Sequence, residues 1–253
     1  VVAMFKQEVR RPDLTAHALA RPTFGSAWRD FITLPQARRL LWALGLGTMG
    51  FTMQDILLEP YGAQVLGLSV SGTTMLTAIF AGGMVLALLI TARSLAKGTD
   101  PILIASIGVM FGVAAFSLVC LSALVDSSSL FQLGVVLIGF GHGLFAVGML
   151  TAAMMFGGKK MVGLTLGAWG AVQATASGVA VFSGGAIRDL VSSWGEVGLL
   201  GMAMRSPAAG YLSVYIFEAA LLFLALASLG PLARRVMTSG NSADGLKLED
   251  FPN

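Results

Sequence analysis

The sequence predicts an all-α membrane protein with six transmembrane helices, and three observations carry this prediction. Of the 253 residues, 56% are hydrophobic and only 11% are charged, whereas soluble domains carry roughly a quarter charged residues. The mean hydropathy is +0.82. Six apolar runs are each long enough for the roughly 20 residues that a spanning helix needs, and basic residues gather in alternate connections between them.

A polar, basic segment over residues 1–39 precedes the first run. Asp13 is suited to cap a short helix over 14–20, and Ser26 to cap a second helix. The apolar side of that second helix would hold Trp28, Phe31 and Ile32. Aromatic side chains beside a basic residue are typical of a helix lying on the cytoplasmic membrane surface. An ordinary loop between domains is the alternative.

The six runs form a predicted transmembrane domain over residues 40–236, and a polar cytoplasmic tail follows over 237–253. The runs cover residues 40–58, 70–92, 101–125, 130–156, 161–187 and 211–232. Of the 16 Lys and Arg residues, all but Arg188 and Arg205 fall in the first segment, in the second and fourth connections, or after the sixth run. Because Lys and Arg are enriched on the cytoplasmic side, both termini are predicted to be cytoplasmic.

Glycine patterns predict where helices pack. The string Gly45-Leu-Gly-Thr-Met-Gly-Phe51 in the first run is similar to Gly139-Phe-Gly-His-Gly-Leu-Phe145 in the fourth. A repeat of three spans would place its second copy upside down in the membrane, although glycine is common in membrane helices. In the fifth run, Gly163 and Gly167, then Ala174 and Gly178, have the spacing that lets helices approach closely.

Two carboxylates lie at the end of the first run, within Gln54-Asp-Ile-Leu-Leu-Glu-Pro-Tyr-Gly62. On a continuous helix Thr52, Asp55 and Glu59 share one face, and Pro60 is predicted to end that helix. Carboxylates at a membrane edge are costly to desolvate, so they mark a functional surface or a tight polar contact. A helix end among interfacial water is the alternative.

Three more polar side chains occupy the membrane-spanning runs. His142 lies near mid-membrane in the fourth run, and Gln173 lies at similar depth in the fifth. A neutral imidazole is a common metal ligand and can bind a magnesium tetrapyrrole axially, and Gly141 and Gly143 would let a flat ligand approach. A hydrogen bond to a neighbouring helix is the alternative. Glu218, inside the sixth run, is expected to meet a tyrosine hydroxyl, a partner protein or a ligand.

The string from Gln54 to Gly62, followed by Val65-Leu-Gly67, resembles the QD-x-LLEP-[FY]-G signature of the PucC family. This family, also called the bacteriochlorophyll-delivery family, belongs to the major facilitator superfamily. The resemblance covers about residues 36–235, the second half of a typical twelve-span member. It implies one half of a major facilitator fold, built from a 3+3 inverted repeat. It also implies a longer native protein with an N-terminal six-helix half.

The resemblance further implies an assembly factor for bacterial light-harvesting complexes that binds or delivers bacteriochlorophyll. Its expected location is the inner, photosynthetic intracytoplasmic membrane. Its expected partners are antenna polypeptides and, as a further candidate, the reaction-centre complex. The candidate pigment-binding residues are His142, Gln173, Gln54, Asp55, Glu59 and Glu218. A proton-coupled transporter of a small solute, and a purely structural antenna-associated subunit, remain as alternatives.

Other functional classes find no support in the sequence. It contains no nucleophile–base arrangement, no paired cysteines and no cluster with metal-ligand spacing. The glycines around His142 are not a dinucleotide fingerprint, because no strand precedes them. The basic residues are explained by membrane topology and need no nucleic acid. We therefore expect neither an enzyme nor a nucleotide or metal-cluster cofactor.

Overall fold

The computed structural model describes residues 24–198, 201 and 205–239, with the backbone alone described at 24, 157–160 and 233–239. Every regular element among these residues is helical, which confirms the all-α prediction. The elements are α2 (Phe24–Thr33), α3 (Pro35–Thr52), the 3₁₀ helix η2 (Met53–Ile56), α4 (Leu58–Gln64), α5 (Val70–Ala96), α6 (Pro101–Leu124), α7 (Ser128–Glu196) and α8 (Ala208–Ser239). The helix expected over 14–20 lies outside the described residues.

Side-chain caps fix the starts of three long helices. The Ser69 hydroxyl accepts from the Gly72 N–H at 3.2 Å, and the Asp100 carboxylate accepts from the Ile102 N–H at 2.8 Å. Ser127 caps α7 in the same way. These caps satisfy N–H groups that have no partner within the helix. The predicted starts at 70 and 101 are confirmed, whereas Ser26 lies inside α2 and not before its first residue.

Four helical stretches are long and apolar enough to cross a membrane, and they support the transmembrane character of the chain. They are Val70–Ala96, Pro101–Leu124, Ser128–Phe156 and Ala208–Leu232. The predicted first span is divided among α3, η2 and α4. The predicted fifth span lies in the later part of α7, where Gln173 and several hydroxyl side chains reduce the apolar character. Six spans, and an inverted repeat relating them, remain predictions.

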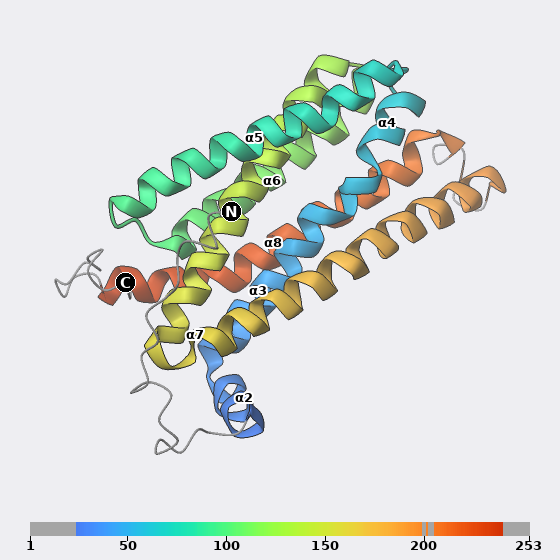
Figure 1. Cartoon of the computed structure of the whole chain (residues 1–253). Coiled ribbons are helices and arrows are strands. Elements are labelled where there is room, and N and C mark those ends of the chain that lie inside the picture. Colours follow the sequence, from blue (N-terminus) through green and yellow to red (C-terminus); the bar gives the residue numbers. More distant parts are fainter. Residues whose placement is uncertain (1–23, 199–200, 202–204, 240–253) are drawn as a thin grey trace, which may run out of the picture.

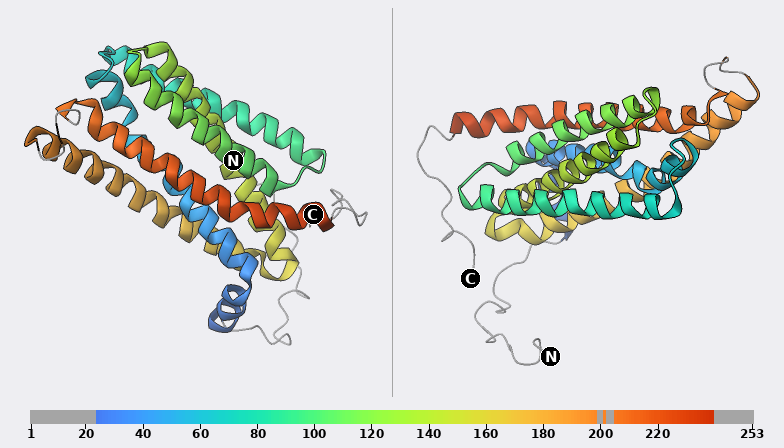
Figure 2. Two further views of the ribbon diagram at one scale, coloured as in Figure 1. Left: turned by 180° about the vertical axis from the view of Figure 1, so that it is seen from behind. Right: turned by 90° about the horizontal axis from the view of Figure 1, so that it is seen from above.

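Helix α7 turns back on itself and so runs through both sides of the bundle. Figure 1 shows the turn in its yellow stretch, which includes the predicted connection 157–160. We call residues 128–156 the first arm and residues 161–196 the second arm. The first arm lies with α5 and α6, and the second lies beside α3 (Figures 1 and 2). Helix α8 contacts α3, α6 and α7.

Glycines bring α5, α6 and the first arm of α7 into close contact. A Cβ atom added at Gly141 would lie 2.6 Å from the Gly108 carbonyl oxygen, and one at Gly83 would overlap the backbone at Val136. By contrast, a Cβ at Gly163, Gly167 or Gly178 would meet nothing within 4 Å. The close helix approach predicted for this second set is therefore not made within the described part of the chain.

The two similar glycine strings lie against each other. Their final aromatic residues, Phe51 on α3 and Phe145 on the first arm, have ring centroids 5.6 Å apart. Gly47 has no side chain at the place where the Phe145 ring packs, and a Cβ there would overlap that ring. This contact holds α3 against the first arm and positions the side chains described next.

Candidate functional site

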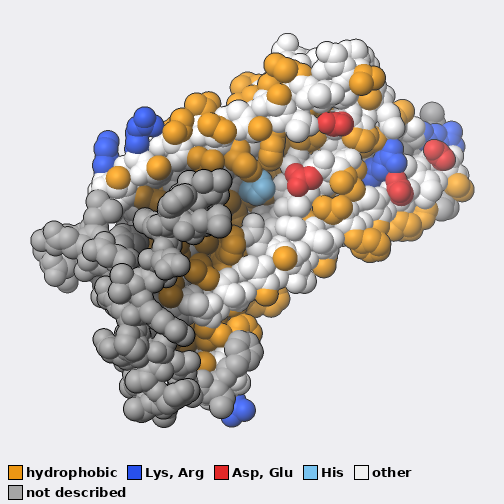
Figure 3. Space-filling model, in the orientation of Figure 1, with side chains coloured by type: hydrophobic (Ala, Val, Ile, Leu, Met, Phe, Trp, Pro, Cys, Tyr) orange, Lys and Arg blue, Asp and Glu red, His pale blue; other side chains and the backbone are white. Residues whose placement is uncertain are grey.

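A cavity of about 510 Å³ lies between α3, η2 and the two arms of α7. Its lining residues are Thr48, Thr52, Asp55, His142, Gln173, Ser177, Gly178 and Val181. The structure thus brings together three of the six candidate pigment-binding residues, His142, Gln173 and Asp55. In Figure 3, a histidine surface lies next to a carboxylate surface, and hydrophobic and uncharged surface surrounds them. Thr48 and Ser177 were missed, because a lone hydroxyl in an apolar run carries no distinctive signal.

His142 is held by aromatic stacking. Its ring lies 5.3 Å from the Phe51 ring, centroid to centroid, with 6° between the ring planes. Phe80 packs at 6.2 Å. The Nδ1 atom is buried and has no hydrogen-bond partner in the part of the chain that the structure describes. The alternative of a hydrogen bond to a neighbouring helix is therefore not observed, and a buried polar atom without a partner calls for an explanation.

The glycines beside His142 serve packing, which corrects one sequence expectation. Gly141 faces α6, where an added Cβ would approach Gly108 and Gly112. Gly143 faces α5, where an added Cβ would lie 2.7 Å from the Ala87 Cβ. Both flanks of His142 are thus covered by helices. A ligand can reach the imidazole from the cavity and not over these glycines.

The helix that carries the signature string is interrupted, contrary to the prediction of a continuous helix to residue 58. Helix α3 ends at Thr52, and η2 separates it from α4. Pro60 lies in the first turn of α4, where its missing N–H breaks no helical bond, so it does not end the helix. Asp55 faces the cavity, whereas Glu59 is exposed and accepts from the Thr77 hydroxyl at 2.8 Å. The two carboxylates therefore do not share a site.

Glu218 points into the bundle and stabilises the interruption between α3 and α4. Its side chain is 0% exposed, and Oε1 accepts from the backbone N–H of Gln54 at 2.6 Å. The Gln54 amide in turn donates to Asp55 and to the Phe51 carbonyl. Among the expected partners of Glu218, a tyrosine hydroxyl is not the one observed. Gln54 and Glu218 therefore lie behind the cavity and link α8 to Asp55.

A second polar cluster joins the ends of α4, α7 and α8. The Arg188 guanidinium donates to Gln64 Oε1 at 3.1 Å and to the Tyr211 hydroxyl at 2.9 Å. Tyr211 also donates to Gln64 at 2.7 Å. The hydrogen bond to Asp189 raises the pKa of Arg188, so its charge is permanent. This cluster fixes α4 relative to α7 and α8.

Comparison with known proteins gives one family. A model of the PUCC protein family matches residues 1–237. The chain is 47% identical to an uncharacterized protein in the puhA-bchM intergenic region of Rhodobacter capsulatus over 235 residues, covering 92% of this chain and 49% of the relative. It is 40% identical to Protein PucC of Cereibacter sphaeroides over 239 residues, covering 94% and 51%.

A more distant relative is named as the 44.5 kDa chain of a bacteriochlorophyll synthase from Rhodobacter capsulatus. The identity is 28% over 176 residues, which covers 64% of this chain and 39% of the relative. The chain spans about half the length of the curated relatives it matches. No solved structure matches it.

Proposed function

The chain belongs to the PUCC protein family, and we propose that it is part of an assembly factor for bacterial photosynthetic light-harvesting complexes that holds bacteriochlorophyll in the cavity between α3 and α7. The observation that carries this proposal is the imidazole of His142, which lines the cavity and whose buried Nδ1 has no hydrogen-bond partner among the described residues. The bacteriochlorophyll synthase chain among the relatives is consistent with a pigment as the ligand.

The lining residues suit a magnesium tetrapyrrole. Such a pigment supplies a metal ion with an axial position, which a neutral histidine can fill. The hydroxyl groups of Thr48, Thr52 and Ser177 and the amide of Gln173 can donate hydrogen bonds to carbonyl groups at the edge of the ring. The volume of about 510 Å³ falls within the roughly 300–1,000 Å³ of ordinary ligand pockets. Asp55, which accepts a hydrogen bond from Gln54, would orient the polar edge of the pigment ring.

The proposed location and partners of the protein are those that its family membership implies. The protein would reside in the inner, photosynthetic membrane with both termini cytoplasmic, and would contact antenna polypeptides and the reaction-centre complex without catalysing a reaction. An N-terminal six-helix half of the same protein would cover the open face of the second arm. Gly163, Gly167 and Gly178 leave space there, and small residues let membrane helices approach closely.

The test compares D55A with E59A in the native protein, expressed in cells that lack the wild-type gene. Asp55 lines the cavity and Glu59 lies outside it, so the two variants remove the same charge from different places. We expect D55A to lower the near-infrared absorbance of antenna complexes at matched protein abundance, and E59A to leave it near the wild-type level. Normal antenna levels in D55A, or equal losses in both variants, would argue against the cavity as the functional site.

The polar lining also favours a second candidate, a proton-coupled transporter of a small solute. Five polar side chains besides the histidine converge on the cavity, as a hydrophilic substrate would require: Thr48, Thr52, Asp55, Gln173 and Ser177. Uptake of solute into proteoliposomes, driven by a proton gradient, with no pigment bound to the purified protein, would favour this candidate. A purely structural subunit would show neither solute uptake nor bound pigment.

A further inference from the structure

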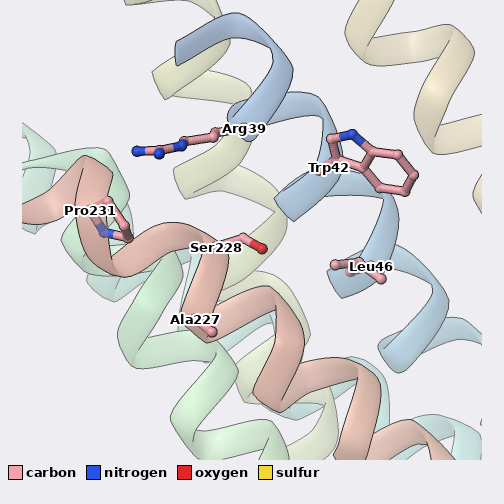
Figure 4. Close-up of a pocket in the computed structure, with 6 residues that line it drawn as sticks. All are labelled: Arg39, Trp42, Leu46, Ala227, Ser228 and Pro231. Carbon is pink, nitrogen blue, oxygen red and sulfur yellow. The ribbon is translucent and has the colours of Figure 1, made fainter. Parts of the chain in front are cut away.

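A second cavity, of about 390 Å³, lies between α3 and α8 and shares no lining residue with the first. We call it the α3–α8 groove. It is lined by Arg39, Trp42, Leu46, Ala227, Ser228 and Pro231. Figure 4 shows Arg39 extending from α3 on the side of the α8 segment that carries Pro231, with Ala227 and Ser228 lower in the view. Nothing in the proposed pigment function uses this groove.

The α3 side of the groove presents a cation, an aromatic ring and an aliphatic side chain in that order. Arg39, Trp42 and Leu46 are three and four residues apart, so they share one helix face. Arg39 is exposed, and the one ion pair among the described residues is that of Arg188 with Asp189. Trp42 is 69% exposed. Basic and tryptophan side chains mark the membrane interface, and aliphatic side chains the hydrocarbon region.

The α8 side presents a hydrogen-bond acceptor. Pro231 lies inside α8 and has no N–H, so the carbonyl four residues earlier, at Ala227, loses its helical donor. The Ser228 hydroxyl does not replace that donor, because it donates to the Leu224 carbonyl at 2.9 Å. None of the described lining residues is acidic. The groove therefore combines a cation on its α3 side and a carbonyl acceptor on its α8 side with the apolar side chains of Trp42 and Leu46.

We propose that the α3–α8 groove binds an anionic phospholipid whose headgroup carries hydroxyl groups, of the phosphatidylglycerol class. The phosphate pairs with Arg39, a headgroup hydroxyl donates to the Ala227 carbonyl, and an acyl chain follows Trp42 and Leu46. Basic pockets between membrane helices bind anionic headgroups in this manner. The apolar residues beneath the cation favour a lipid over a free anion, which would leave them exposed.

The test measures lipid bound to the purified protein by native mass spectrometry, with phosphatidylglycerol or phosphatidylcholine added. The variants are R39Q and its matched control R38Q, since Arg38 is the exposed neighbour that does not line the groove. We expect phosphatidylglycerol to bind in preference to phosphatidylcholine. R39Q should lower its binding roughly five-fold, the change expected for one cation near a membrane surface. R38Q should bind it as the wild type does.

A third variant, A227F, fills the groove without changing charge and should also lose the lipid, since Ala227 is exposed and tolerates a larger side chain. Three results would overturn the proposal. Equal losses in R38Q and R39Q would indicate diffuse surface charge. Displacement of the lipid by the same concentration of inorganic phosphate would indicate a simple anion site. Unchanged lipid binding in A227F would place the lipid elsewhere.

Discussion

Glu218 shows how a single buried side chain determines the shape of the site. At the interruption between α3 and α4, the Gln54 N–H donates to a side chain. The acceptor is the carboxyl group of Glu218 on α8. The same Gln54 positions Asp55 at the cavity. A buried N–H without an acceptor costs about 1–3 kcal/mol, so the contact has an energetic as well as a geometric role.

Replacing Glu218 tests this role. In E218Q the amide oxygen can still accept from Gln54, whereas E218L leaves that N–H without a partner. We expect E218L to lose about 1–3 kcal/mol of unfolding free energy and E218Q to lose much less. Thermal unfolding in detergent measures the difference. Equal stability of the two variants would show that the hydrogen bond does not support the interruption.

Close contacts at glycine residues determine how the helices pack against one another. Gly82 and Gly83 are neighbours on α5, yet only Gly83 faces the first arm of α7, while Gly82 has nothing within 4 Å. Overpacking a well-packed contact costs about 1–3 kcal/mol. An open helical glycine replaced by alanine can gain roughly 0.5–1 kcal/mol.

We therefore predict that G83A lowers the unfolding midpoint and that G82A leaves it unchanged or raises it. The adjacent pair controls for helix propensity, because both positions lie in the interior of the same helix. If G82A destabilises the protein as much as G83A does, the contact of α5 with the first arm is not the one described.

The sequence predicted the parts of the fold that depend on local signals, and one part of the site. The starts of α5 and α6 were predicted from the beginning of the apolar runs at 70 and 101, and the structure adds Ser69 and Asp100 as their caps. His142 and Gln173 could be expected at one level because depth in a membrane follows from position along a helix. The interruption after Thr52 could not be predicted, since the acceptor that supports it, Glu218, is 164 positions from Gln54. The link between Arg188 and Gln64, 124 positions apart, was missed for the same reason.

The orientation of the whole molecule rests on the distribution of Lys and Arg and is directly testable. In a background where Cys120 is replaced by Ala, a single cysteine is introduced at Lys97, in the connection before α6, or at Val125, directly after α6; both positions are exposed. A membrane-impermeant maleimide applied to intact spheroplasts should label V125C and spare K97C. The reverse pattern would place the termini outside the cytoplasm.

The proposed binding of bacteriochlorophyll at His142 is tested most directly by the absorbance spectrum of the detergent-purified protein. We predict that the wild type carries bacteriochlorophyll, that H142L loses most of it, and that H142N, with a weaker ligand, keeps part. The unfolding midpoint of each variant controls for folding. A wild type without pigment, or equal pigment in all three proteins, would contradict the account.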